Sequence, residues 1–316
     1  MEPPNPLRVQ GTPWPGRALV EVKAPATSGN LGPGFDCLGM ALDIWNEVRV
    51  EAGPGGVTIE GEGAETLERD ESNLVHRSIA RVFQETGTTM PDLAVACRNA
   101  IPLARGLGSS SAAVVAGLVA GNALCGDALS TKELLRLAME IEGHPDNAAP
   151  ALLGGCQIVT QDGAKLITAS VTIANPLKAV LFIPDQAMPT AQARALLPPQ
   201  VPRGDAVFNM ARTALLVHAL ATGRYEHLRV ATQDRLHQPP RQAIFPAMPL
   251  IFRAALAAGA LGVFLSGAGS SILALANQRE MTIGYEMADI AEKAGVHGTL
   301  RVAELSTQGA HVVTAE

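Results

Sequence analysis

The feature that most constrains this chain is a glycine- and serine-rich turn that runs directly into an apolar helix. Residues 106–113 read GLGSSSAA, and a stretch rich in Ala and Val continues to about residue 125. Glycines let a backbone turn tightly and approach a ligand, and the free N–H groups at a helix start attract phosphate. The segment therefore predicts a phosphate-binding turn. A strand-to-helix turn capped by serine explains the same residues equally well.

Several better-known ligand loops are excluded by the residues present. No glycine is followed directly by lysine, so the lysine that reaches the terminal phosphates in a Walker A loop is missing. Ser111 stands where the dinucleotide fingerprint requires its third glycine. The chain also lacks the nucleophile elbow GxSxG and the zinc motif HExxH.

Two further glycine-rich segments stand far away in the sequence. Residues 25–39 read PATSGNLGPGFDCLG, which is too rich in Gly, Pro, Ser and Asn for a core element and predicts a long ordered loop. Residues 266–271 read SGAGSS and lie between two apolar stretches. Taken alone, the first is also explained by a structural loop and the last by a hairpin with a glycine bulge.

Apolar periodicity and turn signals predict helices and strands that do not alternate strictly, which favours an α+β fold over a doubly wound sheet. Ser130 or Thr131 is the expected N-cap of one helix. The expected strands are residues 18–24, 47–52, 57–60, 93–98, 157–160, 166–169, 179–183, 262–266, 272–276, 300–305 and 310–314. The expected helices are residues 73–86, 110–125, 131–142, 148–153, 190–196, 206–221, 225–232, 246–258 and 282–294.

Length and composition limit the class of protein. A chain of 316 residues corresponds to about two domains of roughly 150 residues. With 47% hydrophobic residues it is not intrinsically disordered, and its net charge of −6 argues against binding nucleic acid or an anionic membrane. No apolar run reaches the roughly 18 residues of a membrane span. The four cysteines form no CxxC pair, which favours free thiols in a reducing cytoplasm, and residues 1–17 predict a loose proline-rich arm.

In their order, the three glycine-rich segments resemble the motifs of the GHMP kinases, named for galactokinase, homoserine kinase, mevalonate kinase and phosphomevalonate kinase. PATSGNLGPGFD is similar to the first motif, PLARGLGSSSAA to the second and LSGAGSS to the third, although Ser270 stands where proline is frequent. The resemblance implies an ATP-dependent small-molecule kinase with a two-domain α+β fold. It implies a ribosomal-S5-domain-2-like domain at residues 18–168 and a ferredoxin-like domain at 169–316, after the arm at 1–17.

Other stretches resemble the homoserine kinase branch of this superfamily. They are EGHPDN at residues 142–147, PTAQAR at 189–194 and LHQPPR at 236–241. This resemblance implies that the γ-phosphoryl group of ATP is transferred to the hydroxyl of L-homoserine. The products would be O-phospho-L-homoserine and ADP, in a step of threonine biosynthesis. Family members commonly form dimers, so a homodimer is a further expectation.

The resemblance places ATP on the central loop with Mg²⁺ bridging its phosphates. Since Mg²⁺ takes oxygen ligands and needs few protein groups, Ser110 and Glu140 are the expected metal ligands. Glu142 stands two residues further along the expected helix, so it is expected to point elsewhere as a surface acid. The expected ATP-binding residues are Pro102, Leu103, Ala104, Arg105, Gly106, Leu107, Gly108, Ser109, Ser110, Ser111, Ala112, Gly267 and Gly269.

Homoserine presents a carboxylate, an ammonium group and a hydroxyl, and residues that match the family's motifs fit these groups. Arg194 and Arg241 are expected to bind the carboxylate, because a guanidinium can bind both of its oxygens. Asp36 is expected to bind the ammonium group. The other expected substrate contacts are Asn30, His144 and Thr190.

The resemblance implies a short set of catalytic residues. They are Asn147, Asp146 and Glu140, with Asp146 as the candidate base by analogy with the aspartate of related kinases. Phosphoryl transfer depends mainly on positioning and charge neutralisation, so proximity without a base is the alternative.

Three other functions are open at this point. They are a sibling kinase with a different alcohol substrate, an ATP-dependent decarboxylase of the diphosphomevalonate branch, and a non-catalytic ligand-binding relative. Release of ADP or CO₂ that depends on the substrate separates them.

Overall fold

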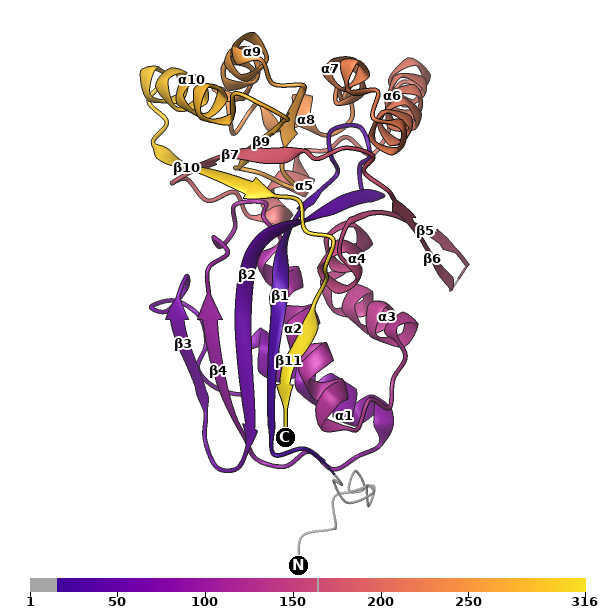
Figure 1. The fold of residues 1–316 in the computed structure, drawn as a ribbon, viewed down its shortest axis with the longest axis vertical. Helices are drawn as coiled ribbons and strands as arrows, with labels where there is room; N and C mark the ends of the chain where they lie inside the picture. Colours follow the sequence, from indigo (N-terminus) through magenta and orange to yellow (C-terminus); the bar gives the residue numbers. More distant parts are fainter. Residues whose placement is uncertain (1–15, 164) are drawn as a thin grey trace, which may run out of the picture.

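The computed structural model describes residues 16–163 and 165–316, so residues 1–15 of the expected arm lie outside the described residues. Two β-sheets, each with its own helices, follow one another along the long axis of the molecule (Figure 1). Within the described ranges, no helix is long and apolar enough to cross a membrane.

A long hairpin forms the centre of the lower sheet in Figure 1. Its strands, β1 (Leu19–Gly29) and β2 (Leu38–Ala52), pair antiparallel along the whole of β1. The sheet order is β11-β1-β2-β4-β3, with β3 and β4 parallel, and β5 pairs with both β2 and β6. The bounds of these strands are β3 (Val57–Gly61), β4 (Leu93–Asn99), β5 (Cys156–Asp162), β6 (Lys165–Val171) and β11 (His311–Ala315).

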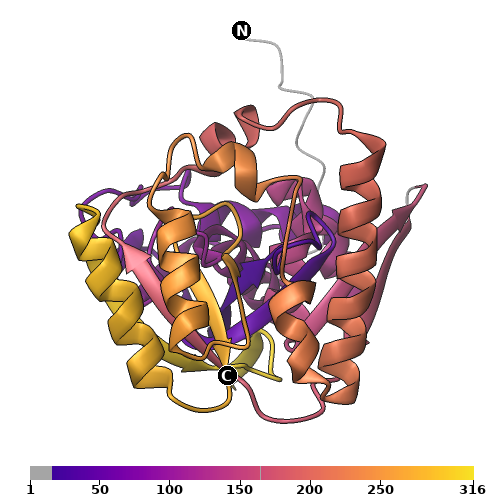
Figure 2. The same ribbon diagram turned by 90° about the horizontal axis from the view of Figure 1, so that it is seen from above.

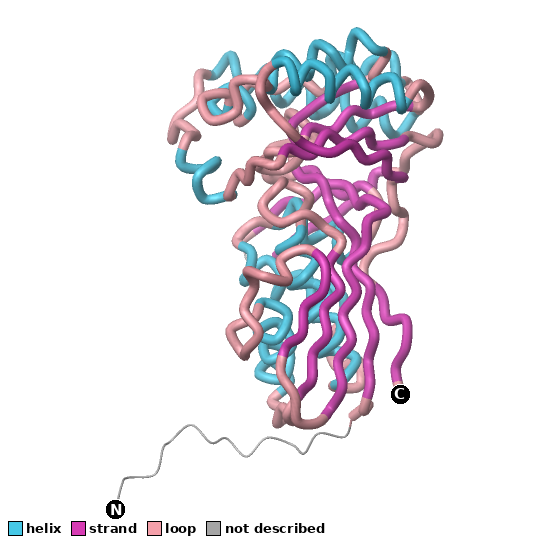
Figure 3. The backbone as a smooth tube through the Cα atoms, turned by 90° about the vertical axis from the view of Figure 1, so that its left-hand side faces the viewer, coloured by secondary structure: helices cyan, strands magenta, loops and turns pink. Residues whose placement is uncertain are grey.

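Four helices cover one face of this sheet, as the side view shows (Figure 3). Their bounds are α1 (Leu74–Thr86), α2 (Ser109–Leu124), α3 (Thr131–Glu142) and α4 (Pro145–Leu153). The apolar helix α2 packs on β1 and β2 and crosses α1 closely. A Cβ atom at Gly117 would lie 2.6 Å from the carbonyl oxygen of Val75, so this crossing requires glycine. Ser130 caps α3 in a capping box with Glu133, as expected.

The upper sheet is antiparallel throughout and has the order β10-β7-β9-β8. Along the chain its main elements run strand, helix, strand, strand, helix, strand, which confirms the expected ferredoxin-like half. Helices lie over this sheet when the molecule is seen from above, with α9 and α10 side by side (Figure 2). The bounds are β7 (Lys178–Pro184), α5 (Thr190–Ala195), α6 (Arg203–Thr222), η1 (Tyr225–His227), α7 (Leu228–Ala231), α8 (Gln238–Arg241), α9 (Met248–Ala258), β8 (Gly262–Leu265), β9 (Ile272–Ala276), α10 (Glu280–Lys293) and β10 (Gly298–Glu304).

The expected division of the chain at residues 168 and 169 requires correction. Strand β6 continues to Val171 and stays paired with β5, so the lower domain extends past residue 168. Strand β11 pairs with β1, so the end of the chain returns to the lower domain and the second domain does not run to residue 316. A remote segment can supply the hydrogen bonds of an edge strand, and the local sequence does not reveal that pairing.

The first glycine-rich segment is a shorter loop than expected. Strand β1 continues to Gly29 and β2 begins at Leu38, which leaves only residues 30–37 as the loop. The pairing of Thr27 with Ala41 and of Gly29 with Gly39 extends the hairpin toward the upper sheet. There the N–H of Gly267 donates to the carbonyl of Gly29 at 3.1 Å. The first and third glycine-rich segments therefore meet where the two domains join.

Candidate active site

A cavity of about 580 Å³ lies at this junction and is lined by residues of both domains. All three glycine-rich segments, the α3–α4 turn, α5 and α8 contribute to its wall. Most of the expected site residues line it: Asn30, Asp36, Pro102, Ala104, Arg105, residues 106–111, His144, Asp146, Asn147, Thr190, Arg194, Arg241 and Gly267.

Four expected residues do not line the cavity. Ala112 is fully buried in α2, and the N–H of Gly269 donates to the carbonyl of Ser266 within the third loop. Leu103 takes part through its backbone carbonyl, which accepts a hydrogen bond from Arg105 Nη1 at 2.9 Å. These three residues are neighbours in sequence of residues that do line the cavity. The fourth, Glu140, points to a different part of the protein.

The central loop has the backbone that its glycines allow. Gly106 and Gly108 have φ angles of +74° and +68°, where glycine is favoured. A Cβ atom at Gly108 would lie 1.9 Å from Oγ1 of Thr27, and one at Gly106 would lie 2.0 Å from the carbonyl oxygen of Ser266. The loop is thus packed tightly between the first and third segments. Helix α2 starts after Gly108 without a side-chain cap, which leaves N–H groups at the cavity for an anion.

Glu142, rather than Glu140, faces the serines of the central loop. Ser110 Oγ donates to Glu142 Oε1 at 2.5 Å, and Ser111 Oγ donates to Glu142 Oε2. The half-buried Glu142 is the last residue of α3 and lines the cavity. The expected placement of Glu142 as a surface acid away from the site is therefore wrong.

Glu140 lies on another face of α3 and is exposed there. Its carboxylate forms ion pairs with Arg136 of the same helix and, at 3.3 Å, with Arg81 of α1. Residues two apart on a helix point in nearly opposite directions, so only one of the two glutamates can face the loop. The expectation placed Glu140 beside the loop, whereas the packing of α3 against α2 brings Glu142 there instead. The structure does not bring Glu140 to the site.

The turn into α4 brings three expected residues together. Asp146 is buried, and its Oδ1 lies 3.1 Å from Nδ1 of His144. Thr27 Oγ1 donates to Oδ1 of Asn147 at 2.9 Å, which links this turn to β1. The hydrogen bond with Asp146 is the main cause that raises the pKa of His144, against the effect of burial. The α4 helix starts at Pro145, earlier than expected, so Asp146 and Asn147 belong to its first turn.

The charged side chains expected to bind substrate also interact with one another. Arg194, on α5, donates to both carboxylate oxygens of Asp36 at 2.9 and 2.6 Å. This pair raises the pKa of Arg194. Asn30 accepts a hydrogen bond from the Asp36 N–H through Oδ1 and donates to the carbonyl of Gly267 through Nδ2. Asp36 and Arg194 are both half-buried and line the cavity, so a ligand with two opposite charges can reach both.

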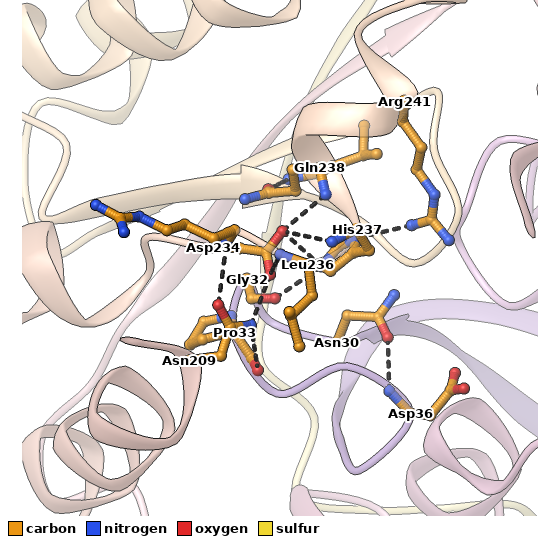
Figure 4. A network of polar contacts seen from close by, with 12 residues as sticks. Asn30, Gly32, Pro33, Asp36, Asn209, Asp234, Leu236, His237, Gln238 and Arg241 are labelled. Carbon is orange, nitrogen blue, oxygen red and sulfur yellow. Dashed lines mark hydrogen bonds and ion pairs between the residues drawn. The ribbon is translucent and has the colours of Figure 1, made fainter. Parts of the chain in front are cut away.

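Arg241 is almost completely buried at the inner wall of the cavity, with 1% of its surface exposed. Its Nη1 donates to the carbonyl of Gly267 at 3.0 Å. The same atom donates to Nδ1 of His237 at 2.7 Å (Figure 4). The Nε of Arg241 is buried and has no hydrogen-bond partner among residues 16–163 and 165–316. Burial lowers the pKa of Arg241 to about 10, with nearby Arg194 as the next cause, so the side chain remains a cation at neutral pH.

Sequence reasoning missed several residues of this wall. Phe35 stacks on His237 with ring centroids 5.3 Å apart, and the Arg194 guanidinium lies 5.4 Å from its ring centroid. The motif GFD at residues 34–36 was recognised, but Phe35 itself was given no role. Thr190 lies in the first turn of α5 and lines the cavity, as expected of a substrate contact. The other unexpected lining residues are Ile141, Glu142, Gly143, Ala191 and Ala268.

Comparison with known proteins gives consistent matches over nearly the whole chain. The family model "GHMP kinases N terminal domain" matches residues 73–155, and "GHMP kinases C terminal" matches residues 216–294. A homoserine kinase of Trichormus variabilis is 43% identical, over 92% of this chain and 98% of that protein. Another homoserine kinase, of Carboxydothermus hydrogenoformans, is 45% identical over 82% of this chain and 86% of that protein. The crystal structure of a homoserine kinase from Cytophaga hutchinsonii superposes with a TM-score of 0.85 at 32% identity, covering 94% and 98%.

Proposed function

The chain belongs to the GHMP kinase family, and from this premise we propose that it is a homoserine kinase of threonine biosynthesis. It transfers the γ-phosphoryl group of ATP to the hydroxyl of L-homoserine and forms O-phospho-L-homoserine and ADP. One observation carries this proposal. The glycine-rich start of α2 and the side chains of Asp36, Arg194 and Arg241 line the same cavity.

The central loop is the proposed site of the ATP phosphates. The backbone N–H groups at the start of α2 carry partial positive charge and have no side-chain cap. Ser109, Ser110 and Ser111 add hydroxyl donors at the same place. Gly106 and Gly108 keep this surface free of side-chain atoms, which lets phosphate oxygens approach the backbone.

The residues of this loop also fit Mg²⁺. Among the described residues, no group of three or more His, Cys, Asp or Glu side chains could hold a metal. Mg²⁺ in kinases is held by one or two protein oxygens and by phosphates, so a large acidic cluster is not needed. We propose Ser110 and Glu142 as its protein ligands, because their oxygens already lie within 2.5 Å of each other. Bound there, Mg²⁺ neutralises phosphate charge.

The charged groups at the other end of the cavity fit the two charges of homoserine. Asp36 would bind the ammonium group, while Arg194 and Arg241 would bind the carboxylate. Asp36 and Arg194 pair with each other, so the zwitterion replaces one ion pair by two. Asn30, His144 and Thr190 complete the proposed binding site at the cavity wall.

The remaining residues orient the hydroxyl that attacks the phosphorus atom. Asn147 lies at the start of α4, and its Oδ1 is held by Thr27. Asp146 is the carboxylate proposed to accept the hydroxyl proton, since it is buried and lines the cavity between the loop and the substrate groups. In phosphoryl transfer the enzyme contributes mainly positioning and charge stabilisation, so correct orientation is the larger part of the effect.

ADP release from ATP and Mg²⁺, measured with L-homoserine, L-serine, mevalonate, galactose or no acceptor, tests this function. We expect release that depends on homoserine alone. In Arg194→Ala and Arg241→Ala the KM for homoserine should rise by about 10-fold or more, because each loses a charge-assisted hydrogen bond. ADP release with mevalonate or galactose instead would make the protein a sibling kinase. CO₂ release would make it a decarboxylase, and ATP binding without turnover would make it a non-catalytic relative.

A cytoplasmic location and a homodimer are further parts of the proposal. All four cysteines are free thiols, which suits a reducing compartment. On α6, Val207 and Met210 expose 53% and 64% of their surface, and a second copy could cover such apolar side chains. Sedimentation velocity on the full chain distinguishes a dimer from a monomer.

A further inference from the structure

The segment from Asp234 to Arg241 connects the first glycine-rich loop to the third. The buried Asp234 carboxylate accepts hydrogen bonds from the N–H groups of Leu236, His237 and Gln238, and from Nδ2 of Asn209 (Figure 4). These bonds fix the start of α8, which is too short to be stable alone.

The same segment is tied to the upper sheet and to the first loop. Gln238 Oε1 accepts a hydrogen bond from the N–H of Leu265, the last residue of β8, at 2.7 Å. His237, which is completely buried, lies with Nε2 2.7 Å from the carbonyl oxygen of Gly32. The His237 ring therefore stands in a rigid frame between the two loops.

The two partners of His237 require a neutral ring with its proton on Nε2. The carbonyl of Gly32 can only accept, so Nε2 must donate to it. The guanidinium of Arg241 can only donate, so Nδ1 must accept from Nη1 at 2.7 Å. Burial lowers the pKa of His237, and nearby Arg241 acts in the same direction. Asp234, whose effect on this pKa is second to that of burial, raises it, as do the bond to Gly32 and Asp36.

In the part of the chain that the structure describes, the two hydrogen-bond acceptors of Arg241 both contact the same nitrogen of its guanidinium group. Nη1 donates both to Nδ1 of His237 and to the carbonyl oxygen of Gly267. Nε is buried and finds no hydrogen-bond partner within the described residues. Nε and Nη2 form the other edge of the guanidinium plane, and the two donors of such an edge can bind both oxygens of one carboxylate. Without the His237 acceptor, only the Gly267 carbonyl would hold Nη1, and the plane could rotate.

We propose that His237 is a positioning residue for substrate binding: its Nδ1 holds Nη1 of Arg241, so that the Nε–Nη2 edge stays free for the carboxylate of the substrate. The inference rests on the proposed role of Arg241 in homoserine binding. Phe35 supports the same arrangement, since it stacks on His237 and its ring centroid lies 5.9 Å from the Arg241 guanidinium carbon.

Two variants of His237 form a matched pair for the test. In His237→Asn the side-chain oxygen falls close to the position of Nδ1, so the acceptor for Arg241 is kept and the donor to Gly32 is lost. In His237→Gln the amide nitrogen falls close to Nε2, so the donor is kept and the acceptor is lost. Both variants remove the imidazole ring and the stacking with Phe35, so a purely structural role would affect them alike.

Steady-state kinetics of both variants, with melting temperatures as a control for folding, decide between these roles. We expect His237→Gln to raise the KM for homoserine by about 10-fold, the effect of one hydrogen bond to a charged group, with the KM for ATP unchanged. The KM for homoserine in His237→Asn should be lower than in His237→Gln by a factor of at least about 3. Equal KM values for homoserine in the two variants would overturn the inference.

Arg241→Ala separates this inference from the proposed function. If it leaves the KM for homoserine unchanged, the role of Arg241 itself is wrong. If it raises KM while the two His237 variants agree, only the positioning role fails. ¹⁵N NMR of the imidazole in the wild-type protein needs no variant. We expect the neutral Nε2–H form at neutral pH, and a proton on Nδ1 would contradict the proposal.

Discussion

At the scale of single residues, the direction of one side chain decides the chemistry. Glu140 and Glu142 stand in the same turn of α3, yet one carboxylate pairs with Arg81 and Arg136 and the other accepts from Ser110 and Ser111. An exposed ion pair contributes at most about 1 kcal/mol. A carboxylate that neutralises phosphate charge through a metal affects the transition state directly.

Substitution of these two glutamates separates the roles. We expect Glu142→Gln to lower kcat by about 100-fold or more, in the range of lost charge stabilisation in a transition state. Higher Mg²⁺ concentrations should not restore it. Glu140→Gln, the matched control, should keep kcat within about 2-fold, because its partners are surface arginines. Steady-state ADP release measures both, and a large kcat loss in Glu140→Gln with normal turnover in Glu142→Gln would reverse the assignment.

At the scale of elements, the site depends on short segments whose positions come from their partners. Helices α5 and α8 have six and four residues, far fewer than an isolated helix needs for stability. Strand β11 has five residues and pairs along the edge of β1. Strand β1 leads to the first glycine-rich loop. By pairing with β1, strand β11 therefore also stabilises the strand from which this loop of the site extends.

Removal of residues 311–316 tests the contribution of β11. The deletion breaks the pairing of Val20, Glu21, Val22 and Lys23 with this strand and leaves β1 as a free edge. We expect a fall in melting temperature of about 5 °C or more, as a loss of a few kcal/mol gives in a protein of this size. Differential scanning calorimetry measures it. An unchanged melting temperature would show that the strand only lies along the sheet without stabilising it.

At the scale of the whole molecule, the phosphate loop is hydrogen-bonded to the segment that leads into α5. Arg105 donates to the carbonyls of Leu103, Pro184 and Asp185, although it also lines the cavity. The N–H of Met188 donates to the carbonyl of Ala104 at 2.9 Å. Helix α5 carries Arg194. When ATP orders the phosphate loop, this connection therefore also favours the ordered position of Arg194 in the homoserine site.

This connection predicts that the two substrates bind cooperatively. In the wild-type protein a non-hydrolysable ATP analogue with Mg²⁺ should lower the Kd for homoserine by about 5-fold, a typical coupling between sites, and homoserine should do the same for the analogue. In Arg105→Ala the factor should fall toward one, because the loop loses its side-chain hydrogen bonds to Pro184 and Asp185, although the backbone bond from Met188 to Ala104 remains. Arg98→Ala, on the exposed face of β4, is the control with unchanged coupling. Isothermal titration calorimetry measures all four constants, and equal coupling in Arg105→Ala would exclude this route.

Local sequence signals predicted much of the fold because they act over a few residues. The turn GLGSSS followed by an apolar stretch marked the start of α2, and the expectation of Ser130 or Thr131 as an N-cap marked the start of α3, where the structure has Ser130. The single ligand site was implied by the resemblance of the three glycine-rich segments to the GHMP kinase motifs, and most residues expected there line a single cavity. The helix starts depend on backbone freedom, capping and periodicity, which neighbouring residues determine by themselves.

Only the tertiary structure decided how distant parts meet. The choice between Glu140 and Glu142 depends on how α3 rotates against α2, and no spacing rule encodes that angle. Strand β11 finds its partner almost the whole chain length away, and α8 is held by Asp234, Gly32 and β8 rather than by its own residues. The proposed role of His237 depends on its burial between two loops and on its hydrogen bonds to Gly32 and Arg241. Such features arise from packing and long-range hydrogen bonds, whose energies depend on the whole fold.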